Sequence, residues 1–568
     1  MTMREKEEPM PVNHSLPRRA FIQTTALTAG ALAASSALPL AAQGVRPNVL
    51  LIMTDDQGYG DLGFHSNPQI RTPHLDQLAR ESAVFERFYV CPVCAPTRAC
   101  LLTGRYNYRT GVVDTFLGRA MMHGDEITMA EVFGNSGYQT GLFGKWHLGD
   151  NAPMRPSDQG FTESLIHRGG GIGQPSDPPG SAYADPTLFH NNTCVHHKGY
   201  CTDVFTDAAI QFIHKNKNTP FFAYLATNAP HTPLQIDPRY VKPYLDQGLD
   251  ETTAKVYGMV ENIDENMGRL LGHLKKAGLE DNTIVIFLTD NGPQQPRYVA
   301  NLRGLKGSVY EGGIRVPCFV RWPRQIQAGT TIQPIAAHID WLPTLIEACG
   351  LQQPSNPLDG RSLLPLLTQR ATNWPDRTLF TQWHRGDVPE PFRDSAAFNQ
   401  RYKLINGKEL YDIQADPGET TDIAATHPQI VEELREHYEA WFSDVSATRG
   451  FAPPRIDLGS ALENPVTLTR QDWRGPRAGW SKESLGYWEV NVRQAGAYHL
   501  SIQFEPMDTE ATIHFKLGST TASQVLAVGA MHCVFQSVAL ASGESRLETW
   551  LESATASRGV EQLVVSRL

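Results

Sequence analysis

Two apolar runs in this chain end in side chains that suit a hard cation. The run N-V-L-L-I-M-T at 48–54 is followed by Asp55 and Asp56, and the run T-I-V-I-F-L-T is followed by Asp290 and Asn291. Continuously apolar runs are typical of buried parallel strands, whose carboxyl ends share one edge of an open α/β sheet. Carboxylate and amide oxygens bind Ca²⁺ or Mg²⁺ without help from thiolate or imidazole. The pattern predicts a hard-cation site at that edge, although an acid at a strand end can instead cap the next helix.

A second group of reactive side chains begins at Cys94, in the sequence C-A-P-T-R-A-C-L-L-T-G-R. Six more motifs, in chain order, are T-D-D-Q-G at 54–58, G-K-W-H-L-G at 144–149, A-P-H-T-P at 229–233, T-D-N-G at 289–292, L-K-G-S-V-Y-E-G-G-I-R-V-P at 305–317 and E-L-Y-D-I with D-P-G-E-T at 409–420. The ordered set, more than any single motif, resembles the sulfatase family of the arylsulfatase type over roughly residues 46–445. Thr97 is a departure, because the family more often has serine there.

The resemblance implies that Cys94 is oxidised to formylglycine, whose hydrated aldehyde is the nucleophile. The oxygens of a sulfate monoester repel an incoming lone pair, so the site must neutralise charge and supply an oxygen nucleophile that can be discharged afterwards. A geminal diol meets the second need, because one hydroxyl attacks sulfur and the other expels sulfate. The alternative is a structural cysteine, buried or in a disulfide with nearby Cys91 or Cys100.

The same resemblance suggests roles for the other polar residues. Arg98 and Lys145 match the cations that hold the formylglycine hydrate and the sulfate, and Lys306 matches the lysine on the sulfate and the leaving oxygen. His147 matches the base that deprotonates the hydrate, and His231 matches a general acid on the leaving-group side. Histidine suits both roles because its ordinary pKa lies near neutrality.

The resemblance favours Ca²⁺ over Mg²⁺, with metal ligands at Asp55, Asp56, Cys94, Asp290 and Asn291. It implies hydrolysis of a sulfate monoester, either an aryl sulfate or a sulfated carbohydrate, and a maturation enzyme that makes formylglycine as a partner. Two alternatives remain open. One is a phosphoester or phosphonate hydrolase on the same fold, and the other is a carbohydrate-binding protein with an inactive catalytic domain.

Residues 1–42 read as an export signal. The sequence P-R-R-A-F-I from Pro17 resembles a twin-arginine motif, and an apolar, alanine-rich stretch follows it. We therefore expect an exported protein, periplasmic or extracellular, with no stable membrane partner; an uncleaved anchor or a Sec signal is the alternative. The net charge of −10, with no basic stripe, argues against nucleic acid as a partner. In an oxidising compartment, Cys194 and Cys201 are the best candidates for a disulfide.

Alternating strand and helix patterns predict a layered α/β fold of the alkaline-phosphatase-like type. Strands are expected at 48–54, 83–88, 139–143, 221–227, 284–289 and 317–321, and helices at 73–80, 127–136, 204–215 and 253–276. This domain spans 43–448 and includes a small antiparallel subdomain at about 375–448. Residues 168–200 are expected to form a long irregular loop near the substrate.

The pattern of apolar and polar residues changes near the C-terminus. Prolines in 449–466 indicate a linker, and period-2 alternation over 467–568 predicts a separate all-β sandwich. Such a domain could bind carbohydrate through Trp473, Trp480 and Trp488. The alternative is that these tryptophans pack in the core or at a domain interface.

Overall fold

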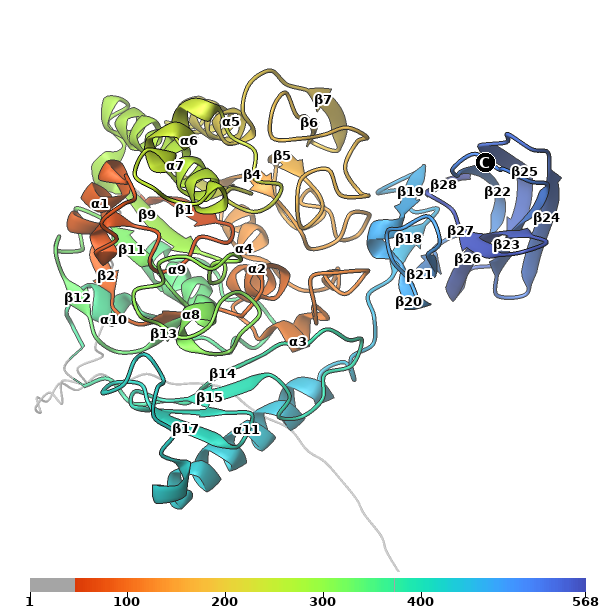
Figure 1. The fold of residues 1–568 in the computed structure, drawn as a ribbon. Helices are drawn as coiled ribbons and strands as arrows, with labels where there is room; N and C mark the ends of the chain where they lie inside the picture. The colour runs from red at the N-terminus through yellow and green to blue at the C-terminus, as the bar shows by residue number, and fades with distance from the viewer. Residues whose placement is uncertain (1–45, 372) are drawn as a thin grey trace, which may run out of the picture. The chain divides into compact units, whose positions relative to one another are not determined.

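The computed structural model describes residues 46–371 and 373–568 (Figure 1). The export signal expected at 1–42 lies outside the described residues. Within the described part of the chain, no helix combines the length and the apolarity needed to cross a bilayer.

A ten-stranded sheet is the centre of the α/β domain, in the order β12-β2-β11-β9-β1-β8-β4-β5-β6-β7. Its strands are β1 (Asn48–Thr54), β2 (Ala83–Phe85), β4 (Gln139–Lys145), β5 (Glu163–His167), β6 (Thr187–His190), β7 (Thr193–His196), β8 (Phe221–Ala226), β9 (Thr283–Thr289), β11 (Cys318–Arg321) and β12 (Thr331–Ile332). β1 pairs in parallel with both β8 and β9, and β4 is parallel to β8 and β5. The carboxyl ends of these strands therefore lie at one edge, as the sequence predicts.

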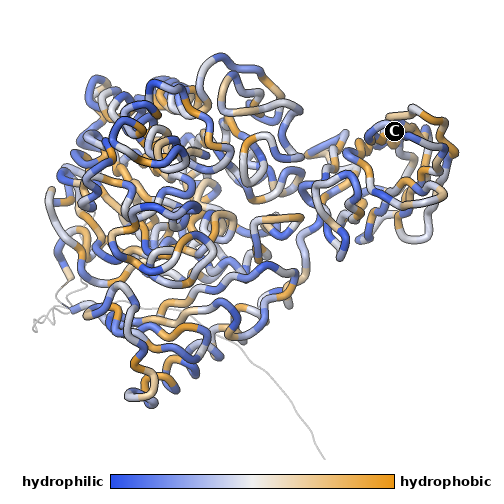
Figure 2. Tube along the Cα trace, viewed as in Figure 1, coloured by the Kyte–Doolittle hydropathy of each residue, from blue (hydrophilic) through white to orange (hydrophobic). Residues whose placement is uncertain are grey.

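Helices cover both faces of this sheet, which explains why β1 is apolar at every position from Val49 to Met53. Leu50 and Ile52 pack in one cluster with the helices α1 (Pro73–Arg80), α5 (Cys201–Lys215) and α7 (Glu251–Lys276). Leu51 and Met53 pack in the other cluster with α2 (Cys94–Thr103), α4 (Met129–Asn135), α9 (Trp341–Cys349) and α10 (Leu364–Leu367). Figure 1 shows α5 and α7, with α6 (Pro238–Leu245), on one side of the sheet and α2 and α9 on the other. In Figure 2 the outer helices alternate between hydrophilic and hydrophobic residues, as helices with one buried face do.

Smaller elements complete the α/β domain. The short helices α3 (Asn107–Thr110) and α8 (Glu311–Ile314) accompany a three-stranded sheet of β10 (Arg315–Val316), β3 (Phe88–Tyr89) and β13 (Ala336–Ala337). The antiparallel sheet of β14 (Leu379–Gln382), β15 (Ser395–Phe398), β16 (Tyr402–Ile405) and β17 (Glu409–Asp412) packs against α11 (Pro428–Ala447). This sheet and helix lie within the residues for which the sequence predicts a small antiparallel subdomain.

The C-terminal residues form two packed β-sheets around one core, which we call the sandwich. One sheet contains β18 (Ile456–Leu458), β20 (Arg474–Arg477), β21 (Leu485–Val492), β23 (Ala511–Leu517), β24 (Thr520–Leu526), β26 (Gly543–Ser553) and β27 (Ser557–Gly559). The other contains β19 (Val466–Thr469), β22 (Gly496–Gln503), β25 (His532–Leu540) and β28 (Gln562–Arg567). β18 pairs with β21, so part of the segment expected as a linker at 449–466 belongs to this sheet. Trp473 and Trp488 are fully buried in the core and cannot stack on a sugar.

Two further expectations are corrected. The segment 168–200 is not wholly irregular, because β6 and β7 form an antiparallel hairpin that extends the central sheet. Cys194 and Cys201 are both free: Cys194 is exposed on β7, whereas Cys201 opens α5 and is buried in the apolar core, so the two side chains lie in different environments.

Candidate active site

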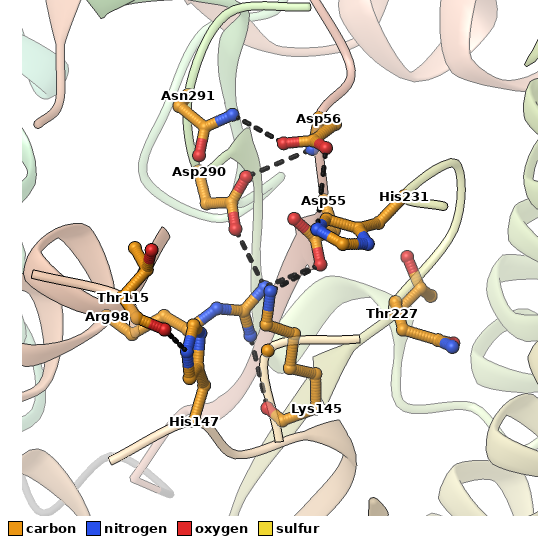
Figure 3. A network of polar contacts seen from close by, with 12 residues as sticks. Asp55, Asp56, Arg98, Thr115, Lys145, His147, Thr227, His231, Asp290 and Asn291 are labelled. Atoms are coloured by element: carbon orange, nitrogen blue, oxygen red, sulfur yellow. Dashed lines mark hydrogen bonds and ion pairs between the residues drawn. The ribbon is translucent and has the colours of Figure 1, made fainter. Parts of the chain in front are cut away.

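The acidic ends of β1 and β9 meet because the two strands are parallel neighbours. The backbone N–H of Asp56 donates to Oδ1 of Asp290 at 3.1 Å, and Nδ2 of Asn291 donates to Oδ1 of Asp56 at 2.7 Å (Figure 3). Asp55, Asp56, Asp290 and Asn291 are each no more than 1% exposed. The sequence-based grouping of these four residues therefore corresponds to one buried cluster.

Three cations are paired with the three carboxylates. Nζ of Lys145, at the end of β4, lies 2.6 Å from Oδ2 of Asp55. Nη2 of Arg98, on α2, donates to Oδ2 of Asp290 at 2.9 Å, and Nζ of Lys306 lies 2.6 Å from Oδ1 of Asp56. Lys145 reaches this edge because Gly144, just before it, lets β4 lie close to β8; a Cβ at Gly144 would lie 1.8 Å from the Ala226 carbonyl oxygen.

Three buried oxygens of the cluster have no hydrogen-bond partner among the described residues: Asp55 Oδ1, Asp56 Oδ2 and Asn291 Oδ1. Leaving such acceptors buried and unsatisfied costs free energy. Each belongs to a side chain whose other polar atom is engaged by a lysine or by a neighbour in the cluster, so the free oxygens are held in place. Such a set of oxygen ligands, with Asp290 beside it, fits a hard divalent cation.

The pKa values of the Asp56 and Asp290 carboxyl groups are shifted in opposite directions. Burial would raise the pKa of Asp56, but Lys306 and His231 outweigh it and hold that pKa below its ordinary value. Burial and the nearby charge of Asp55 raise the pKa of Asp290 to about 6, although Arg98 and Lys145 oppose the shift. A divalent cation would relieve the repulsion between these carboxylates.

Cys94 lies at the first turn of α2, beside the carboxylates. Its Sγ and one oxygen each of Asp55 and Asp290 lie within 4.8 Å of one another, and the residue is 2% exposed. Burial raises the pKa of its thiol, although Lys145 and Lys306 oppose the shift. An unmodified Cys94 is thus mainly the protonated thiol at neutral pH, which is a weak nucleophile. Its side chain does not pair with Cys91 or Cys100, and all three are free.

His147 is held as a neutral imidazole with one free nitrogen. Its Nε2 lies 3.0 Å from the backbone oxygen of Thr115, and because a carbonyl only accepts, Nε2 carries the hydrogen. Its Nδ1 is buried and has no hydrogen-bond partner in the part of the chain that the structure describes. Burial and the charge of Lys145 lower the pKa of His147 well below its ordinary value. Nδ1 is therefore a proton acceptor in a fixed orientation.

His231 lies on the more open side of the site. Its Nδ1 donates to the Thr232 backbone oxygen at 2.7 Å, and its Nε2 lies 3.8 Å from Oδ2 of Asp56. Burial and the charge of Lys306 lower the pKa of His231 to about 3, although Asp56 opposes the shift. The side chains of His231 and Lys306 are 12% and 15% exposed, whereas the other candidate side chains are almost fully buried. These two mark the side from which an ester would approach.

Sequence reasoning missed some contacts of the site. Thr115 acts through its backbone oxygen, for which no side-chain motif exists. Nη2 of Arg297, in the loop that leads to Lys306, lies 2.6 Å from Oδ2 of the buried Asp61. Asp264, on α7, is buried and accepts hydrogen bonds from the backbone N–H groups of His74 and Leu75 at the start of α1.

The layered sheet, with three cations and three carboxylates paired at its carboxyl edge, is the architecture of an alkaline-phosphatase-like hydrolase. A sequence profile of the sulfatases matches residues 47–351, and a profile of the C-terminal region of N-sulphoglucosamine sulphohydrolases matches 305–443. Arylsulfatase A of Bos taurus is 31% identical over 477 residues, which covers 78% of this chain and 89% of that protein. The chain therefore belongs to the sulfatase family.

Solved structures agree with this fold. The crystal structure of Ps i-CgsB in complex with k-i-k-neocarrahexaose matches with a TM-score of 0.64 and 29% identity, over 72% of this chain and 95% of that chain. The phosphonate monoester hydrolase of Agrobacterium radiobacter matches at a TM-score of 0.52 and 22% identity over 71% of this chain and 96% of that chain, a likeness of fold alone. The expectation of an alkaline-phosphatase-like α/β fold followed by a β domain is confirmed.

Proposed function

We propose that this sulfatase hydrolyses sulfate monoesters of carbohydrates, and aryl sulfates as simpler substrates, with a formylglycine made from Cys94 and a bound Ca²⁺. The observation that carries the proposal is the buried cluster in which Cys94 is surrounded by Arg98, Lys145 and Lys306, with free oxygens of three ligands beside it. The structure of Ps i-CgsB in complex with k-i-k-neocarrahexaose supports a carbohydrate substrate.

A hydrated aldehyde at position 94 would supply two hydroxyls. One hydroxyl would form the new O–S bond as the ester S–O bond breaks, and it would lose its proton to a neighbouring carboxylate, Asp55 or Asp290. The aldehyde would then form and release sulfate, before water rehydrates it, when the second hydroxyl loses its proton. His147 accepts that proton on Nδ1, which is free and held toward the site. The departing oxygen takes a proton from Nε2 of His231, whose protonated form is favoured by the anionic ester.

The three cations and a bound metal would offset the negative charge of the sulfate ester. Arg98, Lys145 and Lys306 hold the sulfate oxygens and oppose the repulsion that slows attack on sulfur. A bound Ca²⁺ would polarise a sulfate oxygen and the nucleophile. Asp55, Asp56, Asp290 and Asn291, with residue 94, are the residues that would hold it. The resemblance to the sulfatases leads us to favour Ca²⁺ over Mg²⁺, and several protein oxygens at one site suit Ca²⁺, which takes more protein ligands than Mg²⁺ does.

The test is a paired assay with nitrophenyl sulfate and nitrophenyl phosphate, together with the mass of the peptide that carries residue 94. We expect the sulfate to be turned over faster, and residue 94 to be lighter than cysteine by the change from thiol to aldehyde. Cys94→Ala should lose turnover while it remains folded. An unmodified thiol in fully active protein would overturn the mechanism, and faster turnover of the phosphate would overturn the choice of ester.

We also propose that the protein is exported to the periplasm or beyond, on the support of the twin-arginine-like sequence at Pro17. A substrate as large as a sulfated glycan is met outside the cytoplasm. The maturation enzyme that oxidises Cys94 would then act before export.

A further inference from the structure

The sandwich is attached to the loop that orients His147. We call residues 114–119 the Thr115 loop. Its Gly118 donates a backbone hydrogen bond to the Gln471 carbonyl at 3.1 Å, and the Gly118 carbonyl accepts from Nη2 of Arg474 at 2.8 Å. The rings of Phe116 and Trp480 meet edge to face, with centroids 4.8 Å apart. Three independent contacts therefore connect this loop to the sandwich.

A second contact reaches the other side of His147. Nε2 of Gln471 donates to Oε1 of Gln174 at 3.3 Å, and the same oxygen accepts from the Gly170 backbone N–H at 2.7 Å. A Cβ at Gly170 would lie 2.8 Å from the His147 ring, so the backbone of Gly170 lies directly against the imidazole. The two segments that hold His147 both depend on residues of the sandwich.

These contacts decide which nitrogen of His147 can accept a proton. A neutral imidazole has two tautomers, and the Thr115 carbonyl selects the one with hydrogen on Nε2 and a lone pair on Nδ1. If the Thr115 loop moves away, Nδ1 can take the hydrogen and the base is lost. The ends of the loop are joined by hydrogen bonds from the backbone N–H groups of Val113 and Asp114 to the Arg119 carbonyl, whereas Phe116 and Gly118 contact the sandwich. Loss of the sandwich contacts therefore frees the part of the loop that carries the Thr115 carbonyl.

We propose that the sandwich is part of the catalytic apparatus, and that Arg474 and Trp480 are positioning residues that keep Nδ1 of His147 available. This inference rests on the role of His147 in the proposed function. It differs from a role in substrate retention alone, under which small substrates would be turned over equally well without these contacts.

The decisive variant is Arg474→Met, because it removes the hydrogen bond to Gly118 and strands no charge: the partner Asp387 keeps Arg119 and is half exposed. Arg546→Met is the matched control, since Arg546 also pairs with a carboxylate, Glu489, but lies on β26 and is 62% exposed. If Arg474→Met folds poorly, Trp480→Leu is a second variant that weakens the attachment of the loop, because it removes the ring contact with Phe116.

Two readouts separate positioning from general stability. Hydrogen exchange in the peptide containing the Thr115 loop should rise in Arg474→Met and Trp480→Leu but not in Arg546→Met. With nitrophenyl sulfate, release of the first equivalent of phenol should remain fast while later turnover slows about tenfold or more, because His147 acts only in the release of sulfate. The variant His147→Ala should show the same burst followed by a slow phase.

Equal exchange and equal turnover in Arg474→Met and Arg546→Met would overturn the proposal, as would faster exchange without slower turnover. A loss of burst and steady rate in the same proportion would also overturn it, because that indicates only fewer folded molecules. If His147→Ala itself turns over normally, the proposed function has the wrong base. If His147→Ala slows and Arg474→Met does not, only the inference about the sandwich fails.

Discussion

Replacing Asn291 by alanine should weaken calcium binding while it leaves the charges of the site unchanged. Asn291 contributes one free oxygen, Oδ1, and its Nδ2 donates to Asp56 at 2.7 Å. Asp56 keeps its partner Lys306, so the variant strands no buried charge. Loss of a polar contact to a charged group costs about 1.5–3 kcal/mol, which corresponds to about a 10- to 100-fold weaker Kd.

Asn266→Ala is the matched control, because Asn266 is equally buried and its Nδ2 donates to Asp203 at 2.7 Å, away from the cation cluster. Both variants should lose similar stability without metal. At a calcium concentration of about 100 times the wild-type Kd, calcium stabilises a binding protein by about 2.7 kcal/mol. Asn266→Ala should retain this gain, whereas in Asn291→Ala it should fall to about 1.4 kcal/mol for a tenfold weaker Kd and about 0.4 kcal/mol for a 100-fold weaker one.

The assay is chelation followed by calcium titration, with stability read from denaturant unfolding and affinity from calorimetry. Equal calcium stabilisation in both variants would refute the assignment of Asn291 as a ligand. A magnesium titration of the wild type tests the choice of ion, and tighter binding of Mg²⁺ would contradict it.

Two further predictions concern protons. His231→Ala should slow hydrolysis of a sugar sulfate far more than that of nitrophenyl sulfate, whose phenolate departs without a proton; equal losses would reject the acid role. Burial raises the pKa of Asp177 from 3.8 to about 7. Since a raised carboxyl pKa favours the protonated folded state, this contribution to stability is complete below about pH 3.8 and is lost as the pH rises through about 7. Asp177→Asn should remove that part of the pH dependence of unfolding, and an unchanged profile would show that Asp177 is not its source.

The parts of the site that the sequence predicts are those carried by side chains at strand ends. β1 has the predicted bounds, and its continuous apolarity follows from burial on both faces. Because β1 and β9 are parallel neighbours, placement of Asp55 and Asp290 at one edge needed only the strand pattern. Lys145 follows the same logic at the end of β4.

The parts that the sequence does not predict depend on backbone groups and on packing between distant segments. The Thr115 carbonyl has no signature, and nothing in the sequence links Gly118 to Arg474 across more than 350 residues. The same limit explains the failed pairing of Cys194 with Cys201, since spacing along the chain does not say which side chain enters the core. Trp473 and Trp488 were ambiguous because aromatic side chains serve both packing and sugar stacking.

The charges of the site explain why the metal matters for binding as well as for chemistry. Three buried carboxylates and three buried or nearly buried cations already balance one another as ion pairs. A balanced cluster exerts little net attraction on an anionic ester at a distance. A divalent cation on the free oxygens of Asp55, Asp56 and Asn291 would tip that balance to positive, and by competing for the carboxylates it would free the lysines to turn toward sulfate. The open side at Lys306 and His231 is then where the excess positive charge meets an approaching sulfate.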